Sequence, residues 1–476
     1  MTSSAPPPER DALVQYFDAA APQRDRWIER NRYYHDELER IFSFFIPRGR
    51  SVLEIGSGTG QLLDALHPSR GVGIDLSPGM VRQAAQKYPH LEFRVDDLER
   101  LDIQETFDYV VISDLLGFLH DVQGSFEQLR KVCAPRTRVV LSYYNFLWEP
   151  VLSLGETIGA KAKQPVQNWL GPLDVENLLD IAGFEIIRRQ PRILLPKYVP
   201  LLSALCNRIL VHLPLIEKLA LTFITVARTK PVPIHEACSV SVVIPARNER
   251  GNIEAAVRRT PKLGSHTEII FVEGNSNDGT AEEIDRVIAA YPERHITHIP
   301  QGGGRGKGDA VRKGFAAARG DILMILDADL TVAPEELPKF YNALVSGHGE
   351  FVHGSRLVYP MQKQAMRSLN IVANKFFSIT FTYLLEQRFK DTLCGTKVLL
   401  AHDYRQIAAN RAYFGDFDPF GDFDLIFGAA KLNLKITEIP IHYYARTYGT
   451  TNISRFKHGW LLLQMSAFAM RKLKFI

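Results

Sequence analysis

Two carboxylates in the second half of the chain could bind a metal ion. Asp327 and Asp329 are one residue apart at the end of the apolar run 322–326, so both side chains can reach the same loop. Such a pair suits a hard divalent cation that bridges diphosphate oxygens. The pattern predicts a metal-assisted site for a nucleotide diphosphate.

A glycine-rich turn in the first half could bind a different nucleotide. Gly56, Gly58 and Gly60 directly follow the apolar run 51–55. Glycines at these positions allow a tight turn and a close approach of the backbone to a ligand. We therefore expect an adenosine cofactor here, and a chain that carries out two reactions.

Alternating apolar runs and helical stretches must position both sites. This alternation from residue 51 to about 187 predicts a parallel, doubly wound sheet, and a second α/β series begins at 239. The proline-containing stretch 228–236 is typical of a linker. We expect domains over 1–230 and 238–476, joined by a linker over 231–237. The expected strands are 51–55, 71–74, 91–95, 109–112, 138–141, 185–189 and 222–227, then 239–244, 268–272, 295–299, 321–326, 350–353 and 435–440.

Length and composition limit the class of protein. The 476 residues are too many for one ordinary core, and 46% hydrophobic with 23% charged residues excludes a disordered chain. A net charge of only +4 argues against nucleic-acid binding. The four cysteines lack disulfide or metal spacing, and no secretory signal or membrane span is expected, which predicts a cytoplasmic protein. Residues 10–45 predict one or two amphipathic helices, and the apolar segments 193–227 and 459–470 fit either core helices or membrane-surface contacts.

Acidic residues accompany the glycine-rich turn. Glu54 precedes it, Asp75 ends the second expected strand, and Asp96 and Asp97 end the third. With these features, residues 10–230 resemble the class I S-adenosylmethionine-dependent methyltransferases, which implies a Rossmann-like sheet. Glu54 either faces the ammonium of the methyl donor or orders the loop. The resemblance implies cofactor contacts from Glu54, Gly56, Ser57, Gly58, Asp75, Leu76, Asp97 and Leu98.

The methyl acceptor stays open at this point. The fourth strand is followed by Ser113-Asp114-Leu115-Leu116 and not by the Asn/Asp-Pro-Pro-aromatic motif of nucleobase-amine methylators, which disfavours DNA methylation. Asp114, His120, Tyr143 and Tyr144 lie where the family places acceptor and base groups. His120 is either a base for a hydroxyl acceptor or a helix-capping or core histidine.

Further motifs surround the second carboxylate pair. Residues 245–249 and 272–280 each end an expected strand, and the glycine-rich stretch 304–310 opens a helix. Over about 239–476 the order and spacing resemble the family 2 glycosyltransferases of the dolichyl-phosphate mannose and glucose synthase group, which implies the GT-A fold. The resemblance implies Mg²⁺ or Mn²⁺ on Asp327 and Asp329, phosphate contacts from Lys307 and Arg356, and substrate contacts from Pro245, Ala246, Asn248, Glu249, Glu273, Asn275, Asp278, Asp391 and Arg446.

Departures from the family pattern bear on the donor and on the acceptor. Glu273-Gly274 replaces an acid pair, which could alter preference between uridine and guanosine, and Leu393 replaces a Gln. Ile426 stands where a Glu is frequent, which removes a candidate base. A phosphate acceptor needs no base, whereas a sugar hydroxyl does. Asp424 or Asp422 is then the candidate, and each fits a helix N-cap equally well.

The C-terminal tail combines basic and apolar residues. Residues 445–476 contain no acid, and the apolar stretch 460–465 lies among Arg446, Arg455, Lys457, Arg471, Lys472 and Lys474. This fits contact with an anionic membrane face, or a solvated basic end beside a core helix. Residues 446–452 are a candidate lid over bound phosphates.

These patterns together predict a bifunctional enzyme. The first reaction is methyl transfer from S-adenosylmethionine. The second is inverting transfer of a hexose from a GDP- or UDP-sugar to a polyprenyl-phosphate or glycolipid on the cytosolic membrane face. The alternative is a glycosyltransferase acting on a saccharide hydroxyl, whose first domain only binds the cofactor or docks a partner.

Overall fold

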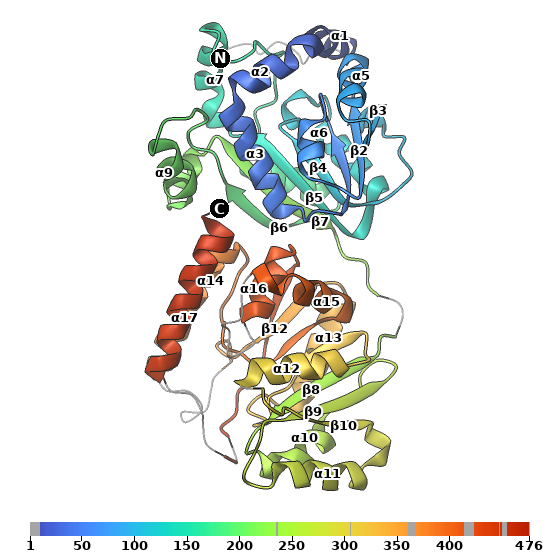
Figure 1. Cartoon of the computed structure of the whole chain (residues 1–476), viewed down its shortest axis with the longest axis vertical. Coiled ribbons are helices and arrows are strands. Elements are labelled where there is room, and N and C mark those ends of the chain that lie inside the picture. The colour runs from blue at the N-terminus through green and yellow to red at the C-terminus, as the bar shows by residue number, and fades with distance from the viewer. Residues whose placement is uncertain are drawn as a thin grey trace. The chain divides into compact units, whose positions relative to one another are not determined.

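The computed structural model describes residues 10–234, 237–304, 306–359, 368–413, 423–446, 448–449 and 455–475. These form two compact units, one over Met1–Lys230 together with Phe475–Ile476 and one over Pro231–Lys474. Each unit contains one seven-stranded sheet with helices packed against it (Figure 1).

The N-terminal sheet has the strand order β3-β2-β1-β4-β5-β7-β6. β1 pairs in parallel with both β2 and β4, so the strand order reverses at β1, and a ligand crevice is expected there. The strands β1 to β5 are parallel as expected, and the whole sheet is mixed because β7 runs antiparallel to β5 and β6. The strands are β1 (Ser51–Ile55), β2 (Arg70–Asp75), β3 (Glu92–Val95), β4 (Phe107–Ser113), β5 (Cys133–Tyr144), β6 (Phe184–Pro191) and β7 (Thr222–Thr229).

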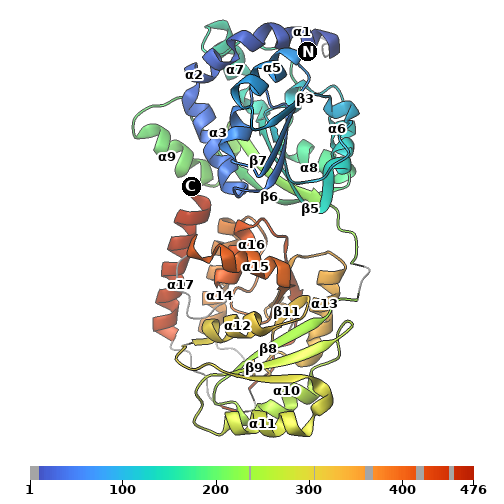
Figure 2. The same ribbon diagram turned by 45° about the vertical axis from the view of Figure 1, so that its right-hand side comes forward.

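The N-terminal helices cover both faces of this sheet. Figure 2 shows α3 on one side and α6 and α8 on the other. α3 presents Leu38, Ile41, Phe42 and Phe45 to the core at helical spacing. Residues 10–45 form three α-helices where one or two were expected. The helices are α1 (Arg10–Ala20), α2 (Arg24–Arg30), α3 (Arg32–Phe45), α4 (Gln61–Ala65), α5 (Pro78–Lys87), α6 (Val122–Leu129), α7 (Glu149–Thr157), α8 (Pro172–Ile181) and α9 (Leu202–Arg208).

The C-terminal sheet has the order β10-β9-β8-β11-β13-β12-β14. β8 lies between β9 and β11 in parallel register, so the strand order again reverses beside the first strand. β13 was not predicted, and it runs antiparallel to β11 and β12. The strands are β8 (Val240–Ala246), β9 (Thr267–Glu273), β10 (Ile296–Pro300), β11 (Ile322–Ile325), β12 (Phe351–Ser355), β13 (Lys397–Leu400) and β14 (Ile436–Pro440).

The C-terminal helices close the second core around buried strand residues such as Val242, Ile244 and Met324. Among the described residues, no helix is both long enough and apolar enough to cross a membrane. The helices are α10 (Ile253–Arg259), α11 (Thr280–Ala290), α12 (Gly306–Ala317), α13 (Leu337–Val345), α14 (Ser368–Leu385), α15 (Ala401–Ala409), α16 (Phe423–Lys431) and α17 (Arg455–Ala469).

Candidate active sites

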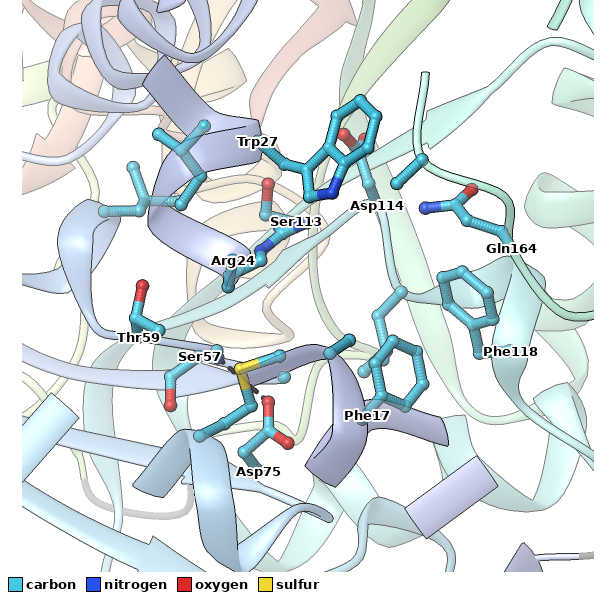
Figure 3. Close-up of a pocket in the computed structure, with 18 of the residues that line it drawn as sticks. Phe17, Arg24, Trp27, Ser57, Thr59, Asp75, Ser113, Asp114, Phe118 and Gln164 are labelled. Carbon is cyan, nitrogen blue, oxygen red and sulfur yellow. Dashed lines mark hydrogen bonds between the residues drawn. The ribbon is translucent and has the colours of Figure 1, made fainter. Parts of the chain in front are cut away.

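A cavity of about 960 Å³ lies where the order of the N-terminal strands reverses. Ligand pockets span about 300–1,000 Å³, so this one is at the upper end and has room for more than a small ligand. Figure 3 shows Asp75 and Ser57 at one side of it and Asp114, Phe118 and Gln164 at another. All eight residues expected to contact the cofactor line this cavity: Glu54, Gly56, Ser57, Gly58, Asp75, Leu76, Asp97 and Leu98.

The glycine-rich turn fixes the carboxylate of Asp75. Gly56 and Gly58 have φ angles of 72° and 52°, which side chains with a β-carbon rarely adopt. The backbone N–H of Gly58 donates to Asp75 Oδ2 at 2.9 Å, and that of Ser77 donates to Oδ1 at 2.9 Å. The end of β2 is therefore held in one orientation toward the cavity, where it can accept from ribose hydroxyls.

Two buried polar atoms in the cavity wall lack hydrogen-bond partners among the described residues. They are Oε2 of Glu54 and Oγ of Ser57. Burial raises the pKa of Glu54 to about 8, and the negative charges of Asp75 and Glu39 act in the same direction. Unpaired buried groups are costly, so a ligand that supplies partners is favoured here. The residues present therefore fit a cofactor with a cationic ammonium group.

Asp97 and Leu98 follow β3 and line the same cavity as the glycine-rich turn. Leu98 is buried, and Asp97 begins the short helical turn Leu98–Arg100 by accepting from the backbone N–H of Glu99 at 2.9 Å. The Asp97 carboxylate also forms an ion pair with Nε of Arg10 at 2.7 Å. This pair places the start of α1 beside the expected adenine site.

The first two helices form part of the cavity wall, which the sequence reasoning did not foresee. Asp18 of α1 accepts from the backbone N–H of Gly79 at 2.7 Å, and Asp25 of α2 accepts from the Thr59 hydroxyl at 2.9 Å. Phe17 packs edge-on against Phe118 with ring centroids 5.3 Å apart. Such long-range contacts leave no local signal beyond amphipathic helix spacing.

Asp114 combines an unusual backbone with buried hydroxyl partners. Its φ is 51°, and its carboxylate accepts from Tyr34 and Ser142, each at 2.6 Å. Burial raises the pKa of Asp114, although these hydrogen bonds act against the shift. A non-glycine residue with positive φ next to a cavity is a common feature of functional sites.

The other candidates for acceptor and base groups lie in two different environments, the cavity and the core. Tyr144 and the exposed His120 also line the cavity, and the backbone N–H of His120 donates to Glu99 at 2.7 Å. Tyr143 is buried and stacks on Phe223, so it belongs to the core.

In the C-terminal unit, Asp327 follows β11 and meets Lys307 of α12. The Lys307 Nζ lies 2.6 Å from Asp327 Oδ1. Burial would raise the pKa of Asp327, but the positive charges of Lys307, Lys397 and Arg356 hold it below its usual range. A β-carbon on Gly395 would lie 2.0 Å from Oδ2 of Asp327, so an alanine there would displace this carboxylate.

Asp329 is linked to Glu249 through one arginine. Arg446 Nη2 contacts Asp329 Oδ2 at 2.6 Å, and its Nη1 contacts Glu249 Oε1 at 2.7 Å. Burial raises the pKa of Glu249, and Arg446 opposes that shift. The hydroxyl of Thr331 also donates to Asp329, at 2.8 Å. This contact orients the carboxylate at the end of β11.

The carboxylate pair suits a divalent cation that also binds ligand oxygens. Among the described residues, no group of three His, Cys, Asp or Glu side chains gathers as a ready metal cage. Mg²⁺ is commonly held by one or two carboxylates plus substrate phosphates, and Asp327 and Asp329 provide that minimal set.

Polar loops after β8 and β9 lie together. Asn248 and Asn275 both have a φ of 56°, and the Asn248 side chain accepts from the backbone N–H of Asn277 at 3.0 Å. Glu273 accepts from the backbone N–H of Ser276 at 2.6 Å. The remaining expected substrate contacts share these two strand ends and loops: Pro245, Ala246, Glu249 and Asp278.

Arg356 and Asp391 form an ion pair in which the carboxylate is fully buried and the arginine side chain is 11% exposed. The Nε and Nη2 of Arg356 contact the two carboxylate oxygens at 2.6 and 2.9 Å. Burial would raise the pKa of Asp391, but Arg356 holds it well below the usual range. Asn374 adds a third donor at 2.8 Å. The geometry gives Arg356 an intramolecular partner in addition to the phosphate expected from sequence.

Asp424 lies at a second, smaller cavity. It is 3.8 Å from Nη1 of Arg312 and 3.5 Å from Nε of Arg411, in a cavity of about 140 Å³. The lining of that cavity includes neither Asp327 nor Asp329. The other candidate base, Asp422, lies outside the described residues, as do Gly421 and Thr447 and residues 450–452 of the expected lid.

Relatives of the C-terminal half transfer sugars, judging by their names. Dolichol-phosphate mannosyltransferase of Saccharomyces cerevisiae is 38% identical over 22% of this chain and 40% of its own length. The protein of the same name in Pyrococcus furiosus is 36% identical over 25% of this chain and 33% of its own. Undecaprenyl-phosphate 4-deoxy-4-formamido-L-arabinose transferase of Pectobacterium atrosepticum is 33% identical over 30% and 45%. The chain thus spans less than half the length of these relatives.

Solved structures match each half at low similarity. Magnesium protoporphyrin IX methyltransferase of Synechocystis PCC 6803, with bound SAH, has 17% identity and a TM-score of 0.35 over 46% of this chain and 100% of its own. Glucosyl-3-phosphoglycerate synthase of Mycobacterium tuberculosis, in complex with Mn²⁺ and UDP, has 18% identity and a TM-score of 0.36 over 50% and 80%.

Family models match both halves. The methyltransferase domain model matches residues 26–189, and the model for glycosyl transferase family 2 matches residues 241–401. The two sheets accordingly belong to a methyltransferase fold and a GT-A-like fold. The chain is therefore a fusion of a methyltransferase domain with a family 2 glycosyltransferase domain.

Proposed function

We propose that the two domains carry out two transfers: a methyl group from S-adenosylmethionine, and a hexose from a GDP- or UDP-sugar to a polyprenyl-phosphate. The observation that carries the first is the pair of unpartnered buried atoms, on Glu54 and Ser57, beside the glycine-rich turn. The observation that carries the second is the paired arrangement Lys307–Asp327 and Arg446–Asp329.

In the glycosyltransferase domain, Asp327 and Asp329 would hold Mg²⁺ or Mn²⁺. When bound, the cation would stabilise the negative charge of the departing nucleoside diphosphate. The configuration at the sugar carbon would be inverted. Lys307 and Arg446 already lie against these carboxylates, so each needs only a local movement to contact phosphate oxygens instead.

The geometry around Asp424 favours a phosphate acceptor over a sugar hydroxyl. Its carboxylate lies beside Arg312 and Arg411 in a cavity that neither Asp327 nor Asp329 lines, so we do not assign it as the base for a sugar hydroxyl. A polyprenyl-phosphate oxygen is anionic near neutral pH and needs no such base. The relatives whose names include dolichol-phosphate and undecaprenyl-phosphate agree with this choice. We propose that the enzyme works at the cytosolic face of a membrane, because a polyprenyl-phosphate is membrane-borne and the four cysteines lack disulfide spacing.

The residues on and around α17 agree with only part of the membrane contact expected from the sequence. Trp460 and Leu463 are exposed on α17, which suits an interfacial helix. Two of the basic residues expected at this surface have other partners, however. Arg446 contacts Glu249 and Asp329, and Lys474 is buried against Glu386.

In the methyltransferase domain, Glu54 would bind the cofactor ammonium and Asp75 the ribose, with Asp97 and Leu98 beside the adenine. Asp114 then remains at the acceptor side of the cavity. A partly desolvated carboxylate with a raised pKa can take a proton from an acceptor hydroxyl or hold an acceptor ammonium. We therefore assign Asp114 to the acceptor.

Calorimetry separates this function from the alternative of a docking module. Titration with S-adenosylmethionine tests cofactor binding, and label transfer to total lipid and glycan extracts tests catalysis. Asp114→Asn is expected to keep cofactor affinity and to lower label transfer by about 10²-fold or more. Absence of cofactor binding to the wild-type chain would remove the methyltransferase assignment. Binding without transfer to any acceptor would favour the docking module.

The acceptor of the sugar is tested with a purified panel. The wild-type chain is incubated with GDP- and UDP-hexoses and either polyprenyl-phosphate or soluble saccharides, with Mg²⁺ or Mn²⁺. We expect transfer to the lipid phosphate. Transfer to saccharides alone, lost in Asp424→Asn, would establish the hydroxyl-directed alternative.

A further inference from the structure

The methyltransferase domain exposes many apolar side chains between β6 and β7. Leu201 is 89% exposed and Leu215 is 75% exposed. Large contiguous apolar patches are rare on proteins that contact only water. We call this surface the leucine face, and it comprises Tyr198, Val199, Leu201, Leu202, Leu205, Ile209, Leu213, Leu215 and Leu219.

Helix α9 buries its polar side and exposes its apolar side, which is the reverse of an ordinary surface helix. Its polar residues Ser203 and Asn207 are buried, whereas Leu202 and Leu205 are exposed. Asn207 Oδ1 accepts from the backbone N–H groups of Leu194 and Leu195, each at 2.8 Å. The Ser203 hydroxyl donates to the carbonyl of Lys197 at 2.8 Å. The helix is thus anchored through its polar side, and its apolar side is turned outward by specific hydrogen bonds.

The two most exposed leucines also have strained backbones. Leu201 has φ 63° and ψ −42°, and Leu215 has φ 73° and ψ −45°. The backbone N–H of Leu202 donates to the carbonyl of Pro200 at 2.7 Å, which closes a tight γ-turn around Leu201. This backbone conformation is unfavourable for a residue with a β-carbon. Because both leucine side chains point into solvent, burial inside the domain does not offset its free-energy cost. Contact of these leucines with an outside partner would offset that cost.

The leucine face adjoins the mouth of the cofactor cavity. The indole N–H of Trp148 donates to the carbonyl of Leu219 at 2.8 Å, which joins α7 to this segment. Trp148, Val151 and Lys197 line the cavity. Leu154 and Ile158 continue the exposed apolar surface along α7.

Basic residues predominate among the charged groups of the leucine face. Lys197, Arg208 and Lys218 are exposed, against the single half-exposed acid Glu217 between residues 197 and 219. An apolar surface with basic residues beside it fits the boundary between acyl chains and anionic headgroups. A protein partner with an apolar groove would not need basic residues beside the exposed leucines.

We propose that the leucine face rests on an anionic lipid leaflet, with Leu201 and Leu215 among the acyl chains and Arg208 and Lys218 at headgroup phosphates. If the adjoining cavity is the methyl-transfer site proposed above, its mouth then opens at the leaflet, and the acceptor arrives as a lipid-linked molecule. The lipid contact itself does not depend on that assignment.

Vesicle sedimentation of the full chain tests this contact. The vesicles contain phosphatidylcholine with or without phosphatidylglycerol. The triple variant Leu201→Gln, Leu205→Gln, Leu215→Gln is expected to lower the partition coefficient by about tenfold or more, because three leucines no longer transfer from water. The matched control is Leu173→Gln with Ile181→Gln, at positions 73% and 53% exposed on α8, which lies across the domain from α9 (Figure 2).

Charge is tested separately with Arg208→Gln and Lys218→Gln. This double variant is expected to lose the preference for phosphatidylglycerol and to keep its partition onto phosphatidylcholine. Calorimetry with S-adenosylmethionine on every variant reports folding and the cofactor site independently of lipid. Should the triple variant lose that heat signal, the single variant Leu215→Gln, with about a threefold or greater drop expected, decides the result.

Three results would overturn the proposal. One is equal partition of wild type, triple variant and control, which would assign lipid binding to another surface such as α17. Another is the absence of vesicle binding by the wild-type chain. The third is a wild-type dimer that the triple variant converts to a monomer without any lipid binding, which would make the leucine face an interface between copies. A chain that binds vesicles through this face but not S-adenosylmethionine would overturn the proposed methyl transfer alone.

Discussion

Protonation of Glu54 should control how tightly the methyl donor binds. The side chain is 2% exposed, and burial raises its pKa to about 8. At neutral pH the ligand-free carboxyl is therefore mostly neutral, whereas a cofactor ammonium requires the ionised form. Binding must then release a proton, and affinity must rise as pH rises toward 8.

The magnitude follows from the ionised fraction. With a pKa of about 8, roughly 1% of Glu54 is ionised at pH 6 and roughly 9% at pH 7, so cofactor affinity should rise about ninefold over that unit. The comparison stays below pH 7 because an α-amino group titrates at about 7.7–8.0 and the ligand would begin to lose its own proton.

Isothermal titration at pH 6 and pH 7 measures this change. In two buffers of different ionisation enthalpy, the heats at pH 7 should report about 0.9 proton released for each cofactor bound. Methylthioadenosine keeps the adenine and ribose but has a neutral thioether in place of the sulfonium and lacks the ammonium, so its affinity should not change with pH. Glu54→Gln should remove the pH dependence and weaken S-adenosylmethionine binding. Equal affinity at both pH values, or the same slope for methylthioadenosine, would refute the assignment of Glu54.

Three other predictions concern single side chains. Ser57→Ala should weaken S-adenosylmethionine by about fivefold without lowering Tm, because it removes an unpartnered buried hydroxyl; unchanged affinity in calorimetry would contradict this. Asp391→Asn should destabilise the C-terminal domain by about 3–5 kcal/mol in urea unfolding, since it leaves Arg356 buried without a counter-charge; a loss below about 1 kcal/mol would contradict it. Gly395→Ala should abolish sugar-nucleotide turnover by displacing Asp327, whereas the control Gly303→Ala, with open space around it, should not; equal activities would refute the contact.

Most strands were predictable because each is a short apolar run, and several, such as β1, β2 and β9, end in or directly before a glycine or an acid. The strand β13 was missed, since its four residues, Lys397–Leu400, follow an irregular segment and show no alternation of apolar and polar residues. The direction of β7 was not predictable either. Its antiparallel course depends on pairing with β5 and β6 after a long proline-broken connection, and no local pattern encodes that pairing.

The residues of the candidate sites were predictable where chemistry and strand ends coincide. Glu54, Asp75 and Asp97 line one cavity as expected. The interactions that depend on distant segments were not predictable. Asp18 of α1 contacts Gly79, and Arg446, which follows β14, contacts the carboxylates of Glu249 and Asp329. Those contacts depend on tertiary packing, which brings together residues far apart in the sequence.

The central claim is that one chain carries out two different transfers, and a double-label assay tests it most directly. Purified chain receives methyl-labelled S-adenosylmethionine and a labelled GDP- or UDP-hexose together with a membrane lipid extract containing polyprenyl-phosphate. The wild type should label lipid with both groups. Asp327→Asn should lose only sugar transfer, and Asp75→Asn should lose only methyl transfer. Full sugar transfer by Asp327→Asn, or a wild type that transfers only one of the two labels, would contradict the account.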